Sequence, residues 1–252
     1  MPRRTAAVDR RAERDALDPR IPLHERVQEA LRRRVEEGEF SPSSPLPAEG
    51  ELAGAYDVSL GTMRRALAGL ASAGLLERRQ GDGTYLRRAR MDGSLFRFFR
   101  HGADTDAVPG SRIVDRSVTR ADEQVADALG CAVGAEVLHL RRHRLRGDVA
   151  FLVEDIWLPL PRFATLAERP LQEFANLLYP MYESECGSVV ASASEELTVG
   201  AADAAEAPVL GCAEGEPVVV VERRARLHTG EVIEFRRTRG AAAGFRYRVE
   251  IR

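Results

Sequence analysis

The stretch VSLGTMRRALAGL, residues 58–70, combines an apolar pattern with basic residues in a way that suits contact with DNA. An apolar face at helical spacing is formed by Met63, Ala66, Leu67 and Leu70. The residues left near its N-terminal end are Ser59, Gly61, Thr62, Arg64 and Arg65. Short polar residues allow close approach to a DNA backbone, and arginine pairs bidentately with guanine or binds phosphate. The alternative is a surface helix whose basic face is only solvated.

A second charged group lies in the other half of the chain. Arg142 and Arg144 are two residues apart in an expected strand, so their side chains share one face. Glu154 falls in the next strand of that hairpin, and we place Glu234 at the equivalent point of a second hairpin. Two arginines and two carboxylates facing one cleft suit an anionic, hydroxyl-bearing molecule. The alternative is a solvated strand face whose charges pair across the sheet.

Neither group resembles a catalytic or metal centre. The five histidines are scattered, and the sequence contains no Ser/His/Asp or Cys/His arrangement typical of nucleophilic catalysis. Cys131, Cys186 and Cys212 have no zinc-ligand spacing, and an odd, sparse set suits a reducing cytoplasm better than secretion. We therefore expect no catalytic residue, no metal and no cofactor.

The overall charge gives little support to a strongly basic nucleic-acid binder. The formal net charge is −2, with 44% hydrophobic and 30% charged residues, which is an ordinary globular composition. Through Arg88 the chain has 16 arginines against 14 acidic residues, so the excess of positive charge in this half is slight. No apolar run approaches the roughly 20 residues that a membrane span needs, so we expect no membrane partner.

Periodicity predicts three helices and a hairpin in the first third of the chain. Apolar residues at helical spacing predict helices over 22–37, 48–56 and 59–73, the last with Ser59 as a plausible N-cap. The sequence QGDG between two short extended runs predicts a tight β-hairpin. This order is that of a winged helix-turn-helix.

The rest of the chain has a different pattern, in which extended runs alternate with short helices. The predicted fold class of the whole chain is therefore α+β. We expect a disordered arm over 1–20, the winged helix-turn-helix domain over 21–88, a polar linker over 89–94 and a second domain over 95–252. The sequences that begin LGCAVGAEV at Leu129 and LGCAEGEPV at Leu210 resemble one another and predict two equivalent hairpins in an antiparallel sheet. Chance similarity is the alternative.

From Pro22 to Leu86 the chain resembles the GntR family of bacterial transcription regulators. The resemblance rests on LP-x-E-x-ELA, VS-x-x-T-x-RRAL-x-x-L and GLL-x-RRQG-x-GT, in the family's order. It implies that the stretch 58–70 is a DNA recognition helix. Matching family positions in the helix and the wing are Ser59, Thr62, Arg64, Gly81, Gly83 and Thr84.

Three positions depart from that family's pattern. Gly50 and Leu60 stand where arginines are usual, and Asp82 stands between the wing glycines. Loss of two arginines removes phosphate or base contacts, and a carboxylate at the wing tip repels phosphate. We therefore expect an atypical operator, with Arg64 and Arg65 carrying more of the binding.

From about Ser94 the chain resembles the UTRA effector-binding domain of the HutC branch of that family. The residues that carry this are EVLHLRRHRLRGDVAFLVEDIWLPLPRF, LLYPMYESECG and GEPVVVVERRARLHTGEVIEFRRTRG. The resemblance implies an antiparallel sheet with helices, similar to the chorismate lyase fold. It also implies that the effector contacts are Arg142, Arg144, Glu154, Tyr179 and Glu234. Departures at Leu177, at Gly240 and in SLFRFFRHG suggest a ligand larger or more apolar than a sugar phosphate, or a domain that has lost ligand binding.

The two resemblances together imply a cytoplasmic, homodimeric repressor that binds a double-stranded operator and is modulated by a sugar phosphate or other anionic metabolite. One alternative is a regulator whose second domain only dimerises or binds a protein partner. Another is an enzyme built on a chorismate-lyase-like domain, for which the sequence offers no catalytic constellation.

Overall fold

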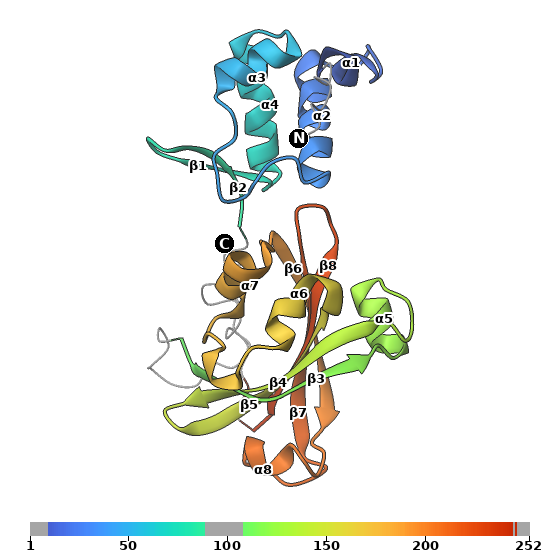
Figure 1. Cartoon of the computed structure of the whole chain (residues 1–252), viewed down its shortest axis with the longest axis vertical. Coiled ribbons are helices and arrows are strands. Elements are labelled where there is room, and N and C mark those ends of the chain that lie inside the picture. Colours follow the sequence, from blue (N-terminus) through green and yellow to red (C-terminus); the bar gives the residue numbers. More distant parts are fainter. Residues whose placement is uncertain (1–9, 89–107, 244, 246–252) are drawn as a thin grey trace. The chain divides into compact units, whose positions relative to one another are not determined.

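The computed structural model describes residues 10–88, 108–243 and 245, and it divides into two compact units, the first made chiefly of residues up to Arg88. The α+β class is confirmed (Figure 1). The predicted linker at 89–94, the start of the second domain at residue 95 and the aromatic segment 94–102 lie outside the described residues.

The first unit is a winged helix-turn-helix. Its elements are α1 (Arg10–Asp15), α2 (Leu23–Glu36), α3 (Glu49–Tyr56), α4 (Leu60–Ser72), β1 (Leu76–Arg79) and β2 (Gly83–Leu86). Apolar residues from α2, α3, α4 and both strands form one core. Met63, Ala66, Leu67 and Leu70 on α4 are all buried, so the apolar face predicted for this helix packs as expected.

The predicted disordered arm differs from the structure at residues 10–15, which form α1. This helix buries no side chain and is held by polar contacts instead. Arg10 pairs with Glu39 at 2.6 Å, and Arg14 donates to the carbonyl oxygens of Tyr56 and Asp57 at 2.7 and 3.2 Å. Composition predicted disorder because the segment is polar, whereas its arginines meet acceptors just after α2 and at the end of α3.

The second unit is built on a six-stranded antiparallel sheet in the order β3-β4-β5-β8-β7-β6. The strands are β3 (Gly110–Arg120), β4 (Glu136–Arg146), β5 (Val149–Pro159), β6 (Ser192–Ala201), β7 (Pro217–Arg226) and β8 (Val232–Ala241). The helices are α5 (Glu123–Leu129), α6 (Leu160–Ala167), α7 (Leu178–Cys186) and α8 (Ala207–Leu210), with a 3-10 turn, η1, at Leu171–Glu173.

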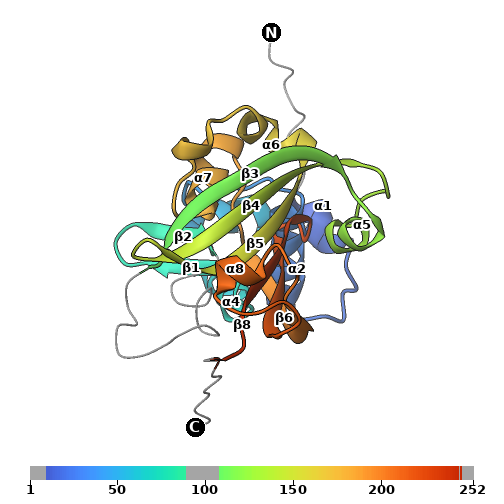
Figure 2. The same ribbon diagram turned by 90° about the horizontal axis from the view of Figure 1, so that it is seen from below.

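The helices cover both faces of this sheet. Helices α6 and α7 pack on the face that carries Leu138, Leu140 and Ile156, and Figure 2 shows them beside the band of β3 and β4. Helices α5 and α8 pack on the opposite face, against Val137 and Val153 respectively. The face under α6 and α7 is the one that holds the charged side chains described below.

The two hairpins predicted from the internal similarity are β4–β5 and β7–β8, which lie next to each other through β5 and β8. Each follows a short helix that ends at a left-handed glycine, Gly130 with φ 67° and Gly211 with φ 66°. Because glycine adopts this conformation without a steric penalty, the shared LGCA opening marks the same helix end twice.

Candidate functional site

The N-terminus of α4 holds two of the predicted DNA-binding residues side by side. The Ser59 hydroxyl caps the helix by accepting from the Thr62 backbone N–H at 3.1 Å, and the two hydroxyl oxygens lie 2.9 Å apart. The N-cap predicted at Ser59 is therefore confirmed. A helix N-terminus is a favourable position for a phosphate because of its free N–H groups and positive dipole end.

Arg64, on the next turn of α4, is tied to an acidic residue that the sequence analysis did not single out. The Glu49 Oε2 atom accepts from Arg64 Nε at 2.8 Å, and Oε1 accepts from Arg78 Nη2 at 2.8 Å. Glu49 is the first residue of α3, Arg64 lies on α4 and Arg78 lies on the wing strand β1. The only signal in the sequence was the glutamate of the LP-x-E pattern.

The predicted wing residues lie at the hairpin turn and beside the loop before α3. Gly81 and Gly83 have φ values of 77° and 129°, which an L side chain rarely adopts, and a Cβ on Gly83 would lie 3.1 Å from Pro45 Cβ. The Leu46 N–H donates to the Thr84 carbonyl oxygen at 2.7 Å, which fixes the wing against this loop. Gly81, Gly83 and Thr84 thus shape the wing, and Gly81 and Gly83 are exposed.

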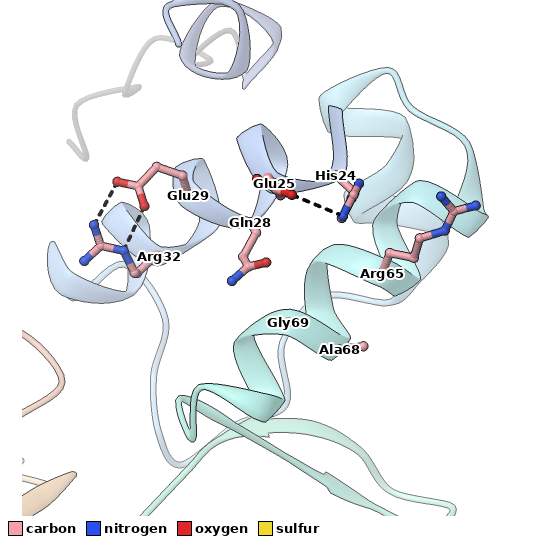
Figure 3. A pocket seen from close by; sticks show the side chains of 8 residues that line it. All are labelled: His24, Glu25, Gln28, Glu29, Arg32, Arg65, Ala68 and Gly69. Atoms are coloured by element: carbon pink, nitrogen blue, oxygen red, sulfur yellow. Dashed lines mark hydrogen bonds and ion pairs between the residues drawn. The ribbon is translucent and has the colours of Figure 1, made fainter. Parts of the chain in front are cut away.

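Arg65 lies apart from the contact between Arg64 and Glu49. It lines a groove of about 590 Å³ between α2 and α4, where Figure 3 shows its side chain extending away from Gln28 and Gly69. The same groove carries Glu25 and Glu29, so its charge is mixed and does not favour a phosphate. The structure brings Arg64 together with the wing and does not do so for Arg65.

In the second unit the predicted anion-binding residues are buried and connected. Arg142 and Glu154 are direct partners across β4 and β5, and Arg142 Nε donates to Glu154 Oε2 at 2.5 Å. Arg144 Nε lies 3.3 Å from the same oxygen. The side chains of Arg142, Arg144 and Glu154 are 0%, 1% and 2% exposed. The charges do pair across the sheet, but the alternative of a solvated strand face is wrong.

Glu234 joins this cluster through residues on α7 and β8. Its carboxylate accepts from the hydroxyls of Tyr179 and Tyr182 at 3.0 and 2.7 Å and from Arg236 Nη2 at 2.6 Å. Arg236 Nη1 also lies 3.7 Å from Glu154 Oε1. All five predicted effector residues therefore belong to one network, which we call the buried charge cluster.

Several members of the buried charge cluster were missed in the sequence. Arg236 and Thr238 alternate with Glu234 along β8, and Thr238 donates to Glu154 Oε1 at 3.3 Å. Their period of two was a readable signal, because alternate residues of a strand share a face. Tyr182, three residues after Tyr179 on α7, carried the corresponding helical signal.

The equivalence predicted between Glu154 and Glu234 is wrong by two residues. Aligning the two LGCA openings pairs Arg142 with Arg223, and the strand partner of Arg223 is Arg236, whereas that of Arg142 is Glu154. Glu234 instead lies opposite Ala225. The turn between β7 and β8 is longer than that between β4 and β5, which shifts the register while keeping Glu234 on the same face.

The electrostatics of the cluster favour an added negative charge. Burial by itself raises the pKa of Glu154, but Arg142, Arg144 and Arg236 outweigh burial and hold that pKa well below its usual range. Burial lowers the pKa of Arg144 to about 9, so it stays charged at neutral pH. Burial and the Glu234 carboxylate raise the pKa of Tyr179 to about 12, so it remains a hydroxyl donor.

Arg142 retains unused hydrogen-bonding capacity in this cluster. Its Nη1 and Nη2 atoms are buried and have no hydrogen-bond partner among the residues that the structure describes. Buried polar groups are nearly always hydrogen-bonded, so such an exception calls for an explanation. Three guanidinium groups, those of Arg142, Arg144 and Arg236, face only two carboxylates, Glu154 and Glu234, which leaves one positive charge in excess.

Other kinds of site find little support in the described residues. Within 10–88, 108–243 and 245, no group of three His, Cys, Asp or Glu side chains could hold a metal ion. The described helices include none that is long and apolar enough to cross a bilayer. A winged helix-turn-helix joined to a domain with a buried, cationic cluster defines a class of protein: a DNA-binding regulator with a ligand-sensing domain.

Comparison with known proteins gives the family. Residues 23–86 match the model of the gntR family of bacterial regulatory proteins, and residues 105–246 match the UTRA domain. The chain belongs to the GntR family and carries a UTRA domain, as do repressors of the HutC type. It is a transcriptional regulator of that kind, consistent with a repressor modulated by a metabolite.

Individual relatives support this assignment. The chain is 30% identical to the transcriptional repressor NagR of Bacillus subtilis over 85% of this chain and 88% of the relative. It is 26% identical to the mannosyl-D-glycerate transport/metabolism system repressor MngR of Escherichia coli, over 86% and 90%. It is similar to the crystal structure of PhnF from Mycobacterium smegmatis, with a TM-score of 0.51, 28% identity and coverage of 90% and 99%.

Removing the central carboxylate should strongly destabilise the second unit. We expect Glu154→Gln to lower the free energy of unfolding by about 3 kcal/mol, because it leaves buried guanidinium groups without a counter-charge. Trp157 is the only tryptophan of the chain and lies on β5, so its fluorescence during urea unfolding reports on this unit. Glu136→Gln, an exposed change at the start of β4, is the matched control. A loss below about 1 kcal/mol for Glu154→Gln would contradict the stabilising role assigned to the buried charge cluster.

The same carboxylate predicts acid sensitivity. Because the pKa of Glu154 is lower in the folded than in the unfolded chain, its stabilising effect is complete above the usual value of 4.5 and is lost as the pH falls below it. We expect the unfolding free energy measured through Trp157 to fall progressively as the pH is lowered below about 4.5 towards the depressed pKa of the folded chain. Glu154→Gln should show a shallower fall; an equal slope would assign the acid effect to other carboxyl groups.

Restoring an arginine on α3 should strengthen DNA binding. Gly50 is exposed, and no atom lies within 4 Å of the position a Cβ would take. We expect Gly50→Arg to raise affinity for duplex DNA and to steepen the dependence of log K on log salt concentration by about 0.9, as one added phosphate contact requires. Gly54→Arg, equally unobstructed and one turn along α3, is the control for charge and helix propensity. Equal effects of the two variants would show that position 50 does not face DNA.

Proposed function

We propose that the protein acts as a homodimeric repressor that binds a palindromic operator through its winged helices and senses an anionic metabolite in the buried charge cluster. The single observation that carries the sensing role is the pair of unpartnered, fully buried terminal nitrogens of Arg142. A planar guanidinium fork suits bidentate binding of a carboxylate or phosphate. Since bacterial DNA lies in the cytoplasm, we assign the protein to that compartment.

The proposed residues divide by role. On the DNA side we assign Ser59, Gly61, Thr62, Arg64, Arg65, Gly81, Gly83 and Thr84. On the effector side we assign Arg142 and Arg144 to the acidic group. Glu154, Glu234 and Tyr179 are assigned to hydroxyl groups, because carboxylates accept and the tyrosine donates.

The chemistry in one relative's name agrees with an oxygen-rich anion. Mannosyl-D-glycerate carries both hydroxyls and a carboxylate, the two kinds of group that the cluster can bind. We do not assign catalysis to this domain, because the relatives are named as regulators. A ligand affects DNA binding only by binding one arrangement of the dimer better than another, so its effect reports the difference between two affinities.

The ion pairs of Glu154 support a second candidate function, a regulator whose second domain binds no metabolite. The Glu154 carboxylate already pairs with Arg142 and Arg144, which is the arrangement expected of a cluster that only stabilises the sheet. The second domain would then dimerise without a metabolite. Ligand binding distinguishes the two candidates.

The first test is DNA binding by the full chain. Duplex fragments flanking the protein's own gene, measured by fluorescence anisotropy at two salt concentrations, should include one bound with a clear margin over a scrambled duplex. We expect Arg64→Ala to abolish that margin, because a bidentate contact contributes about 1–3 kcal/mol of discrimination. Arg33→Ala on α2, also exposed and ion-paired, should leave it unchanged. Wild-type preference in Arg64→Ala would contradict the role of α4.

The second test is thermal stabilisation by anions. Hexose 6-phosphates and mannosyl-D-glycerate are suitable probes, and a ligand at 100 times its Kd adds about 2.7 kcal/mol of stability. We expect at least one to raise the Tm reported by Trp157 in the wild type and not in Arg142→Gln. The neutral sugars are the matched controls. No shift with any anion would favour the domain that only dimerises.

A further inference from the structure

We infer that Glu49 is a positioning residue for DNA binding, which holds Arg64 of α4 and Arg78 of the wing as one unit that docks on DNA. The inference rests on the proposed role of α4 and the wing. Neither Glu49 nor Arg78 was among the residues expected to contact DNA.

The geometry joins three separate elements through one side chain. Each carboxylate oxygen of Glu49 accepts from a different arginine, both at 2.8 Å, and the partners are 15 and 29 residues away in the chain. The first residue of α3 thereby connects the recognition helix to strand β1 of the wing. Among the residues that the structure describes, Glu49 is the ion-pair partner of both Arg64 and Arg78, and neither arginine has another.

The exposure of the three side chains argues against a purely structural role. Arg64 and Arg78 are 61% and 57% exposed and Glu49 is 29% exposed. Ion pairs this exposed contribute little to folding. What the contact does restrict is the freedom of two long side chains, and a group already held in its bound conformation loses less entropy on binding.

The atoms used leave the arginines able to bind DNA. Arg64 donates through Nε, so neither terminal nitrogen is engaged by Glu49. The two terminal nitrogens form the fork that pairs with guanine or phosphate. Arg78 donates through Nη2 and keeps Nη1 and Nε. Glu49 therefore orients both guanidinium groups, leaving the terminal fork of Arg64 free for a bidentate contact and leaving Arg78 with single donors for a phosphate.

The negative charge of Glu49 and its orientation of the two arginines have opposite effects on DNA binding, so removing Glu49 should change two measurable quantities in different directions. Glu49 lowers the local charge from two positive to one, so its removal should strengthen sequence-independent attraction to phosphates. The same removal releases both arginines, so discrimination between sequences should fall. If Glu49 only neutralised charge, its removal would not lower discrimination between sequences. If it only supported the fold, its removal would not raise non-specific affinity for DNA.

The experiment compares three variants of the full chain on two probes. The probes are the preferred duplex from the gene-flanking fragments and its scrambled version, each titrated at several salt concentrations. Glu49→Gln should bind the scrambled duplex more tightly, with a salt slope steeper by about 0.9, and should lose about tenfold in preference for the native sequence. Glu49→Asp keeps the charge but shortens the side chain, and should lose preference with no gain on scrambled DNA.

Glu51→Gln is the matched control, since it removes the same charge two residues along α3. Glu51 accepts from the Ala48 N–H at 3.0 Å, a capping contact that glutamine can keep, and it touches neither arginine. It should bind scrambled DNA as Glu49→Gln does but keep the wild-type preference. Preference retained in Glu49→Gln, or lost equally in Glu51→Gln, overturns the inference alone. A wild-type chain without any preference overturns the proposed function and the inference with it.

Discussion

The burial of Glu154 at the centre of the sheet is the constraint on which the second unit depends. A carboxylate that is 2% exposed remains charged only where positive groups surround it, and three arginines from β4 and β8 do so. Those arginines in turn require β4 and β8 to flank β5 in a fixed register, since a slip of one residue would turn each of them to the other face. The strand order and the adjacent hairpins bring these charges together, and the tyrosines of α7 donate hydrogen bonds to Glu234.

The first unit has a similar arrangement of charges, but at the solvent-exposed surface and not in the core. One carboxylate, Glu49, is shared by arginines from two elements, as Glu154 is shared by arginines from two strands. In the interior such sharing determines whether the fold is stable, because an unpaired charge there is costly. At the surface it changes stability little and mainly limits the conformations of the arginines.

Short-range patterns in the sequence predicted much of this, and contacts between distant segments account for what was missed. The helix faces, the Ser59 cap and the shared face of Arg142 and Arg144 follow from periods of 3.6 and 2 that a single segment displays. The contact of Glu49 with Arg78 spans 29 residues and left no periodic signal. The placement of Glu234 failed for a definite reason: sequence similarity aligned the starts of the hairpins, while the longer turn between β7 and β8 decided which residues lie opposite each other.

The two similar hairpins carry opposite charges at corresponding points, Glu154 in one and Arg236 in the other, and these two side chains approach to 3.7 Å. In a hypothetical ancestor with identical hairpins, this approach would set two glutamates or two arginines against each other. Such a pair could not be buried in the ionised state without large repulsion. Divergence at this single position therefore replaces a repelling pair by an attracting one at the centre of the sheet.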